Sequence, residues 1–178
     1  MLTAKQYEGI GRFMIAFNEI DAVLKAYLPL VLQYSNCSLP PPHNAPRNFH
    51  ARAVSLRMAL EATSDADEIA GAYAGEILKI LDMANRVASK RNAYVHAVAI
   101  IDFATNTRML QMRSGTAPPD EKQIFDLARE AWFVASKLAE ECEELLRMYL
   151  SVNRASLESA SAGEWDESNE FDDPETTE

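Results

Sequence analysis

The sequence predicts an all-α protein, an up-down bundle of four to five helices with a small β-hairpin after the third long helix. Apolar residues recur at spacings of three, four and seven over long stretches, which is the pattern of helices with one buried face. Hydrophobic residues make up 48% of the chain and there are only 6 glycines, a composition that favours helix. One stretch after residue 96 changes to β-branched residues and alternation, which indicates strands.

The length and the charge indicate one folded domain with a tail. A chain of 178 residues is long enough for one domain with a substantial core. The formal net charge is −10, but residues 151–178 hold nine acidic residues and one basic residue. We therefore assign residues 1–150 to the helical domain and residues 151–178 to an acidic disordered tail. Such a tail acts either as a solubilising segment or as an acidic decoy that occupies a basic groove on its own domain or on a partner.

The sequence favours a soluble cytoplasmic protein without a bound metal or cofactor. The N-terminal residues lack the basic start and apolar run of a signal peptide, and no stretch approaches the ~20 apolar residues of a membrane span. Cys37 and Cys142 alone form neither a disulfide framework nor a metal-ligand set, and Cys142 fits a small core position. No glycine-rich nucleotide-binding motif is present.

The first helix begins at a capping box formed by Thr3 and Gln6. Pro29 is expected to kink or end this helix. Glu19 and Asp21 interrupt the apolar rhythm. They are either solvated, or one first-helix residue, Glu19 or Asn18 beside it, approaches the polar cluster near residue 91. The apolar stripe consists of Ile10, Phe13, Met14, Phe17, Leu24, Tyr27, Leu28, Val31 and Leu32.

A second helix is expected over residues 47–63, after a proline-rich loop at residues 35–46. Its buried stripe is formed by Phe49, Ala53, Leu56 and Leu60. Arg47, Arg52 and Arg57, together with His50, give this helix a basic character. These side chains form either a solvated face balanced by acidic neighbours or a strip that follows the phosphates of a nucleic acid.

The third helix is expected to start at Ser64, with acidic residues in its first turn, and to have residues 89–96 at its far end. Gly71 and Gly75 lie inside it, four residues apart, a spacing that allows close helix–helix approach. The apolar stripe consists of Ile69, Tyr73, Ile77, Ile80, Leu81, Ala84 and Val87.

Two strands are expected to follow, over residues 96–103 and 108–113. An isolated hairpin is marginally stable, so this one is expected to pack on the bundle. The last helix is expected to run from Pro119 to about Leu150, with a buried side that includes Ile124, Ala131, Leu138, Cys142 and Leu145.

The end of the third helix gathers three chemically capable side chains, Arg91, Asn92 and His96. Arg91 has a fork of donors suited to phosphate, and histidine is the side-chain type whose unperturbed pKa lies near neutral pH. A five-residue step on an ideal helix leaves Arg91 and His96 about 140° apart, whereas Asn92 and His96 share a face. The cluster is therefore either a helix end that gathers the three side chains or part of a groove shared with another chain.

This Arg-Asn-x3-His pattern after a long helix resembles the motif of HEPN domains. The resemblance covers about residues 1–150 and implies a helical homodimer in which both motifs face each other across the interface. It also implies a metal-independent endoribonuclease of toxin–antitoxin or anti-phage defence systems, with RNA as substrate and an antitoxin or regulatory protein as possible partner. Arg91, Asn92 and His96 are then the catalytic residues: His96 takes the proton of the ribose 2′-OH or protonates the leaving oxygen, and Arg91 stabilises the phosphate charge.

Two alternatives to catalysis stay open. An Arg and a His at a helix end often only cap carbonyl groups and interact with the helix dipole. Other members of the resembled family have lost catalysis, so the chain is alternatively a non-catalytic helical dimerisation or interaction module.

Overall fold

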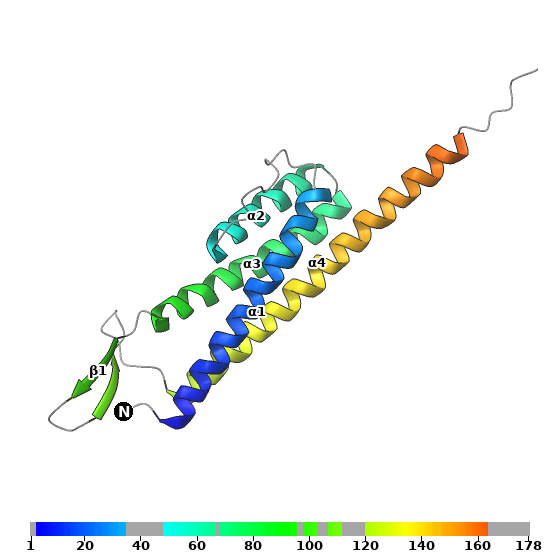
Figure 1. The fold of residues 1–178 in the computed structure, drawn as a ribbon. Helices are drawn as coiled ribbons and strands as arrows, with labels where there is room; N and C mark the ends of the chain where they lie inside the picture. Colours follow the sequence, from blue (N-terminus) through cyan, green and yellow to red (C-terminus); the bar gives the residue numbers. More distant parts are fainter. Residues whose placement is uncertain are drawn as a thin grey trace, which may run out of the picture.

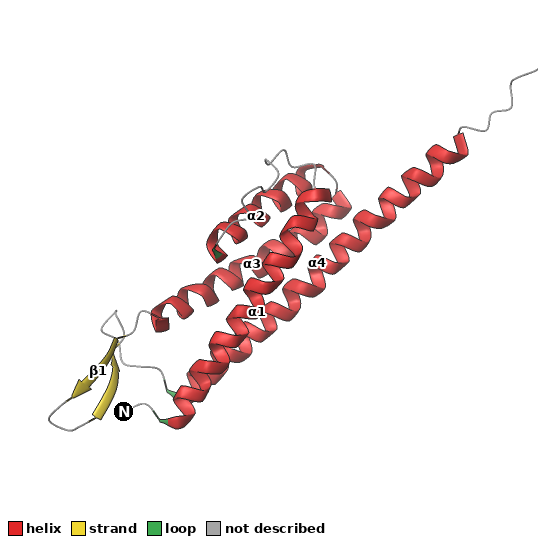
Figure 2. Cartoon of the chain, in the orientation of Figure 1, coloured by secondary structure: helices red, strands yellow, loops and turns green. Residues whose placement is uncertain are grey.

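In the described part of the chain, a computed structural model shows a bundle of four α-helices (Figure 1). The described residues are 3–34, 48–66, 68–95, 98–102, 107–111 and 120–163. The helices are α1 (Ala4–Tyr34), α2 (Phe49–Ala66), α3 (Glu68–Val95) and α4 (Glu121–Gly163). The predicted helical bundle is confirmed (Figure 2).

α1 and α4 lie side by side and run in the same direction (Figure 1). At their N-terminal ends, Thr3 Oγ1 donates a hydrogen bond of 2.6 Å to Glu121. Towards their other ends, the ring of Tyr34 stacks on that of Tyr149 with the ring centroids 6.0 Å apart. These two contacts fix the relative register of the two longest helices.

α2 also runs parallel to α1, so the prediction of a strict up-and-down order is wrong. The first turn of α2 lies beside the middle of α1, where the Phe17 and Phe49 ring centroids are 5.2 Å apart. Its far end meets α4, where the hydroxyl groups of Thr63 and Tyr149 lie 2.9 Å apart. The connection of residues 35–47 allows this order, because an extended chain of that length spans about 40 Å and the return along α1 needs only about 25 Å.

The space around each helical glycine shows where neighbouring helices lie close together. A Cβ atom on Gly9 would lie 2.6 Å from Cγ2 of Ile124, so α1 and α4 meet at a distance that only glycine allows. At Gly71 the added atom would lie 3.2 Å from the backbone oxygen of Ser64, whereas nothing lies within 4 Å at Gly75. The predicted close approach in α3 is therefore made by Gly71 and not by Gly75.

Side-chain caps begin three of the helices. The predicted capping box is confirmed: Gln6 N donates to Thr3 Oγ1 at 3.0 Å, and Thr3 N donates to Gln6 Oε1 at 2.8 Å. Asn48 caps α2, where it accepts a hydrogen bond of 2.9 Å from Ala51 N. A second reciprocal box of Asp120 and Gln123 starts α4.

Of the two outcomes predicted for Pro29, a kink or an end of the helix, the second is not found. The helix continues to Tyr34, and Pro29 lies on its exposed side. Leu28 and Val31 on the opposite side are buried, with 3% and 0% exposure. Burial of these side chains offsets the loss of one backbone hydrogen bond at the proline.

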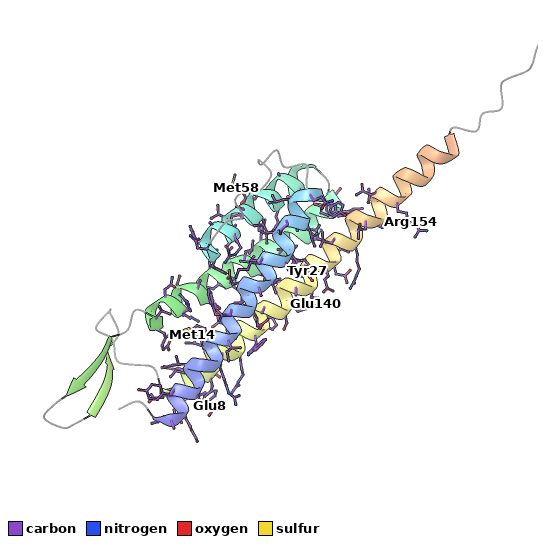
Figure 3. All side chains as sticks on the ribbon, viewed as in Figure 1. Glu8, Met14, Tyr27, Met58, Glu140 and Arg154 are labelled. Carbon is purple, nitrogen blue, oxygen red and sulfur yellow. The ribbon has the colours of Figure 1, made fainter. Side chains whose placement is uncertain are left out.

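The core lies along the facing stripes of all four helices, as the apolar spacing predicts (Figure 3). Cys142 is a fully buried core residue, and burial raises the pKa of its thiol to about 12. Ile69 was assigned to the buried stripe of the third helix, but it is 67% exposed. The largest fully buried side chains are Phe13, Ile20, Leu24, Leu56, Leu60, Ile77, Leu81, Ile124, Leu138, Leu145, Val31 and Val87.

Two short strands, β1 (Val98–Asp102) and β2 (Thr107–Gln111), occupy the segment in which the sequence predicts a hairpin. They pair antiparallel, with Val98 opposite Gln111 and Asp102 opposite Thr107. Within the described residues the strands contact each other and no helix, and Figure 1 shows them beyond the end of the bundle. The expected packing of the hairpin on the bundle is therefore not found.

α4 is longer than predicted. It was expected to end near Leu150 but continues to Gly163, so residues 151–163, which were assigned to the disordered tail, are helical. This part of α4, which includes Arg154, extends past the ends of the other helices (Figure 3). Among the described helices, none combines the length and the apolar character that crossing a membrane requires.

Candidate functional site

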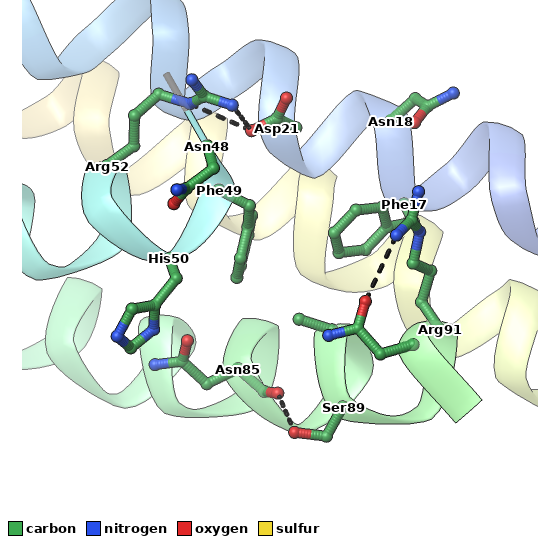
Figure 4. Close-up of a pocket in the computed structure, with 12 residues that line it drawn as sticks. Phe17, Asn18, Asp21, Asn48, Phe49, His50, Arg52, Asn85, Ser89 and Arg91 are labelled. Carbon is green, nitrogen blue, oxygen red and sulfur yellow. Dashed lines mark hydrogen bonds and ion pairs between the residues drawn. The ribbon is translucent and has the colours of Figure 1, made fainter. Parts of the chain in front are cut away.

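A pocket of about 740 Å³ lies where the middle of α1, the first turn of α2 and the last turns of α3 meet (Figure 4). Several of its walls are polar, and Asn18, Asn48, His50 and Asn92 are exposed to solvent. The lining residues are Phe17, Asn18, Asp21, Asn48, Phe49, His50, Arg52, Asn85, Ala88, Ser89, Arg91 and Asn92. The pocket thus contains two of the three residues of the predicted motif.

Arg91 is held in this pocket without a carboxylate partner among the described residues. Its guanidinium carbon lies 5.3 Å from the centroid of the Phe17 ring, and Nη1 donates a hydrogen bond of 3.2 Å to Asn92 Oδ1. Its Nε is buried and has no hydrogen-bond partner within the described structure. A buried N–H left unpaired costs about 1–3 kcal/mol, which an acceptor that reaches this atom would offset.

Stacking on Phe17 explains how Arg91 keeps its position without an ion pair. A guanidinium over an aromatic ring is attracted by about 0.5–2 kcal/mol, depending on how far it is desolvated. By contrast, the arginines of α1 and α2 are bound in ion pairs with acidic side chains. Because no carboxylate among the described residues pairs with Arg91, its charge stays available for an anion from outside the described chain.

Tyr94, within the predicted motif, anchors the last turn of α3. Its side chain is 9% exposed, and its ring packs edge-on against Phe13 with the centroids 5.7 Å apart. Burial raises the pKa of Tyr94 above its ordinary value of 10.0. Because Arg91 lies one turn before Tyr94, this contact fixes the direction in which Arg91 leaves the helix.

α3 presents a polar stripe to the pocket. Asn85, Ala88, Ser89 and Asn92 follow the helical spacing of i, i+3, i+4 and i+7, so they share one face. Ser89 Oγ donates to the backbone oxygen of Asn85 at 3.0 Å. The Asn85 side-chain amide itself makes no hydrogen bond within the described structure and lines the pocket. This spacing is visible in the sequence and is the signal from which Asn85 and Ser89 could have been predicted.

α2 contributes a neutralised ion pair. Arg52 is 6% exposed and pairs through its guanidinium with Asp21 of α1, which also accepts from Lys25 at 2.9 Å. Burial opposes ionisation of Asp21, but the hydrogen bonds from Arg52 and Lys25 outweigh it, so the pKa of Asp21 lies below its ordinary value of 3.8. Arg52 therefore joins α2 to α1.

The predicted basic strip along α2 does not form a continuous surface. Arg57 pairs with Asp82 of α3 and approaches Glu61, which agrees with a solvated face balanced by acidic neighbours. Arg47 lies outside the described residues. His50 is exposed and lines the pocket, and its ring has no hydrogen-bond partner in the described structure. Arg52 also lines the pocket, but it is bound to Asp21.

Arg91 and Asn92, which are consecutive in the sequence, both line the pocket, and so does Asn18 of α1, one of the two first-helix candidates. Glu19, the alternative first-helix candidate, is exposed and does not line the pocket. His96 lies outside the described residues, one position after the last residue of α3. Asn48, His50 and Asn85 are pocket residues that the motif did not identify.

Among its described residues, the site offers one guanidinium without an ion pair, Arg91, beside neutral hydrogen-bonding groups. This arrangement suits an anion that carries a polar group. No cluster of three or more metal-ligating side chains occurs among the residues that the structure describes. Compared with known proteins, the chain matches no family model, no curated protein and no solved structure.

Proposed function

We propose that this protein is a metal-independent endoribonuclease of the HEPN type, with Arg91, Asn92 and His96 as catalytic residues. The observation that carries the proposal is the guanidinium of Arg91, which lines the pocket and has no carboxylate partner among the described residues. A phosphodiester is a monoanion with oxygen acceptors, and a guanidinium binds such a group through parallel hydrogen bonds.

The reaction is an internal transfer at the phosphate. The ribose 2′-oxygen attacks the adjacent phosphorus, and the bond to the 5′-oxygen of the next nucleotide breaks, which leaves a 2′,3′-cyclic phosphate and a 5′-hydroxyl. Neutral His96 takes the 2′-OH proton, and a protonated His96 gives a proton to the leaving oxygen. Arg91 stabilises the charge of the pentacoordinate phosphate, and Asn92 orients Arg91 through its side-chain oxygen.

A homodimer supplies two copies of this set, so that one histidine acts as base and the other as acid. Large aromatic side chains on α4 support self-association: Trp132 is 45% exposed and Phe133 is 53% exposed. Aromatic residues of this kind are enriched in protein interfaces. They also favour the second candidate function, a non-catalytic dimerisation or interaction module, in which the Arg91 cluster serves structure alone.

The test incubates the purified protein with unstructured RNA in EDTA beside Arg91→Ala and His96→Ala. Arg86→Ala is the matched control, because Arg86 is exposed, lies on the same helix and does not line the pocket. We expect cyclic-phosphate products from the wild type and from Arg86→Ala, and a loss of at least about a hundredfold in the other two variants. RNA that stays intact, or products that persist in both site variants, would reject catalysis at this site. Intact RNA combined with a stable dimer would favour the interaction module.

A further inference from the structure

The pocket has two chemically different ends along α3. Arg91 stands at one end, and Asn85 lies six residues earlier at the other, about 9 Å away along the helix axis. His50, from the first turn of α2, faces Asn85 across the pocket (Figure 4). A ligand that reaches from Arg91 to His50 therefore meets a cation at one end and an imidazole and an amide at the other.

The end at His50 and Asn85 is neutral and has unused hydrogen-bonding capacity. Neither the imidazole of His50 nor the side-chain amide of Asn85 makes a hydrogen bond within the described structure. Asn48 uses its side-chain oxygen to cap α2 and keeps its NH₂ group for other partners. Amides and imidazoles both donate and accept, so this end can bind a heterocycle through the edge that carries its own donors and acceptors.

The charges of the described lining residues favour a ligand with one phosphate group. Arg52 and Asp21, the other charged residues that line the pocket, form an ion pair with each other. Among the lining residues that the structure describes, Arg91 is then the one arginine without an ion pair. A di- or triphosphate would set further negative charges against neutral amides, whereas one nucleotide unit of RNA has one phosphate and a neutral base.

Phe49 supplies an apolar surface between the two ends. Its ring is half-buried, lines the pocket and lies tilted by 50° against that of Phe17. Bases of single-stranded RNA are commonly bound by stacking on aromatic side chains and by hydrogen bonds to their edges. The geometry thus points to a base-binding subsite beside the phosphate position.

We propose that the pocket binds one nucleotide of RNA, with its phosphate at Arg91 and its base against Phe49, His50 and Asn85, and that His50 and Asn85 set the base preference beside the cleaved bond. This inference rests on the proposed ribonuclease function for the identity of the ligand as RNA. It deepens that function, because it assigns specificity to α2 and α3 residues of the same chain that lie outside the Arg-Asn-x3-His motif.

The first test measures cleavage of an RNA pool with all base combinations around the scissile bond. Asn85→Ala and His50→Ala are compared with wild type, and Asn153→Ala is the matched control because Asn153 is exposed on the part of α4 beyond the bundle. We expect a base preference in the wild type and in the control, reduced about tenfold in Asn85→Ala. Cleavage with an unchanged pattern in both pocket variants would overturn the subsite and leave the ribonuclease function intact.

The second test separates the two proposals by binding alone. Nuclear magnetic resonance titrations compare the four 5′-mononucleotides with inorganic phosphate, on wild type and on Asn85→Ala. We expect one mononucleotide to bind at least about fivefold more tightly than phosphate to the wild type, and this difference to disappear in Asn85→Ala. Equal affinity of all five ligands would overturn the subsite. A nucleotide preference in a protein that cuts no RNA would retain the subsite and reject the ribonuclease function.

Discussion

Replacing Arg52 with methionine removes the cation of its pair with Asp21 while keeping most of the buried stem. Arg52 has a side-chain exposure of 7% and Asp21 of 17%, so the pair is largely out of water. Breaking a buried pair by removing one partner costs about 3–5 kcal/mol, because the other charge remains. Lys25 still contacts Asp21 at 2.9 Å, so we expect the lower end of this range, about 3 kcal/mol.

Arg57→Met is the matched control for this prediction. Arg57 lies on the same helix and pairs with Asp82, but the two side chains are 32% and 57% exposed. An exposed pair of this kind contributes about 0–1 kcal/mol. Urea unfolding followed by far-UV circular dichroism gives both free energies of unfolding, and the two variants should differ by at least about 2 kcal/mol.

The same experiment decides between the two interpretations of the basic residues of α2. If Arg52 holds α2 on α1, then Arg52→Met loses about 3 kcal/mol of stability. Equal, small losses of stability in both variants would refute the reasoning. A normal stability with a weakened RNA affinity and a smaller salt dependence would instead assign Arg52 to phosphate binding.

Three further predictions follow from contacts in the bundle. Gly9→Ala should lower the free energy of unfolding by about 1–2 kcal/mol, because the clash of the new Cβ with Ile124 outweighs the gain in helix propensity. Gly75→Ala should raise the free energy of unfolding by about 0.5–1 kcal/mol, because nothing lies within 4 Å of the new Cβ. Urea unfolding measures both values. The pKa of Asp21 is lower in the folded protein than its ordinary value of 3.8. The Asp21 carboxylate therefore contributes its full stability above about pH 3.8, and this contribution is lost as the pH falls through the folded-state pKa. The stability difference between wild type and Asp21→Asn over a pH series measures the contribution. The Cys142 thiol is buried with a pKa of about 12, so in a Cys37→Ser background it should react with a thiol reagent only when the protein unfolds.

Each of these predictions has an outcome that contradicts it. Stabilisation by both glycine substitutions would mean that α1 and α4 are not in contact at Gly9. A constant stability difference between wild type and Asp21→Asn down to pH 2 would mean that Asp21 is not held by its cations. Rapid labelling of Cys142 under native conditions would mean that α4 does not bury its inner face at that position.

Local patterns in the sequence predicted the helices well because each depends on neighbouring residues alone. The box of Thr3 and Gln6 and the buried position of Cys142 are both found as expected. Where a local sequence preference conflicted with packing between helices, the packing determined the structure. Pro29 is tolerated inside α1 because the neighbouring side chains are buried in the bundle.

The pocket could be predicted only in part, because it is formed by residues from three helices. Arg91 and Asn92 were identified through their proximity in the sequence. The direction of α2 is not encoded in any local pattern, and it is this direction that brings His50 to Asn85 and Arg52 to Asp21. The basic character of α2 was therefore visible in the sequence, while the separate roles of Arg52 and His50 were not.

The length of α4 bears on the acidic segment that follows it. α1 and α4 start level with each other, so Phe17 in the pocket lies beside about residue 135 of α4, and the helix continues from there to Gly163. That distance is about 42 Å, whereas the stretch from Gly163 to Phe171 spans about 28 Å even when fully extended. Trp165 and Phe171, the aromatic residues of this acidic segment, therefore cannot reach the pocket of their own molecule. If they cover a site of this kind, the site belongs either to the partner in the proposed homodimer or to another dimer. Inhibition within one dimer is independent of protein concentration once the dimer has formed, whereas inhibition between dimers is not.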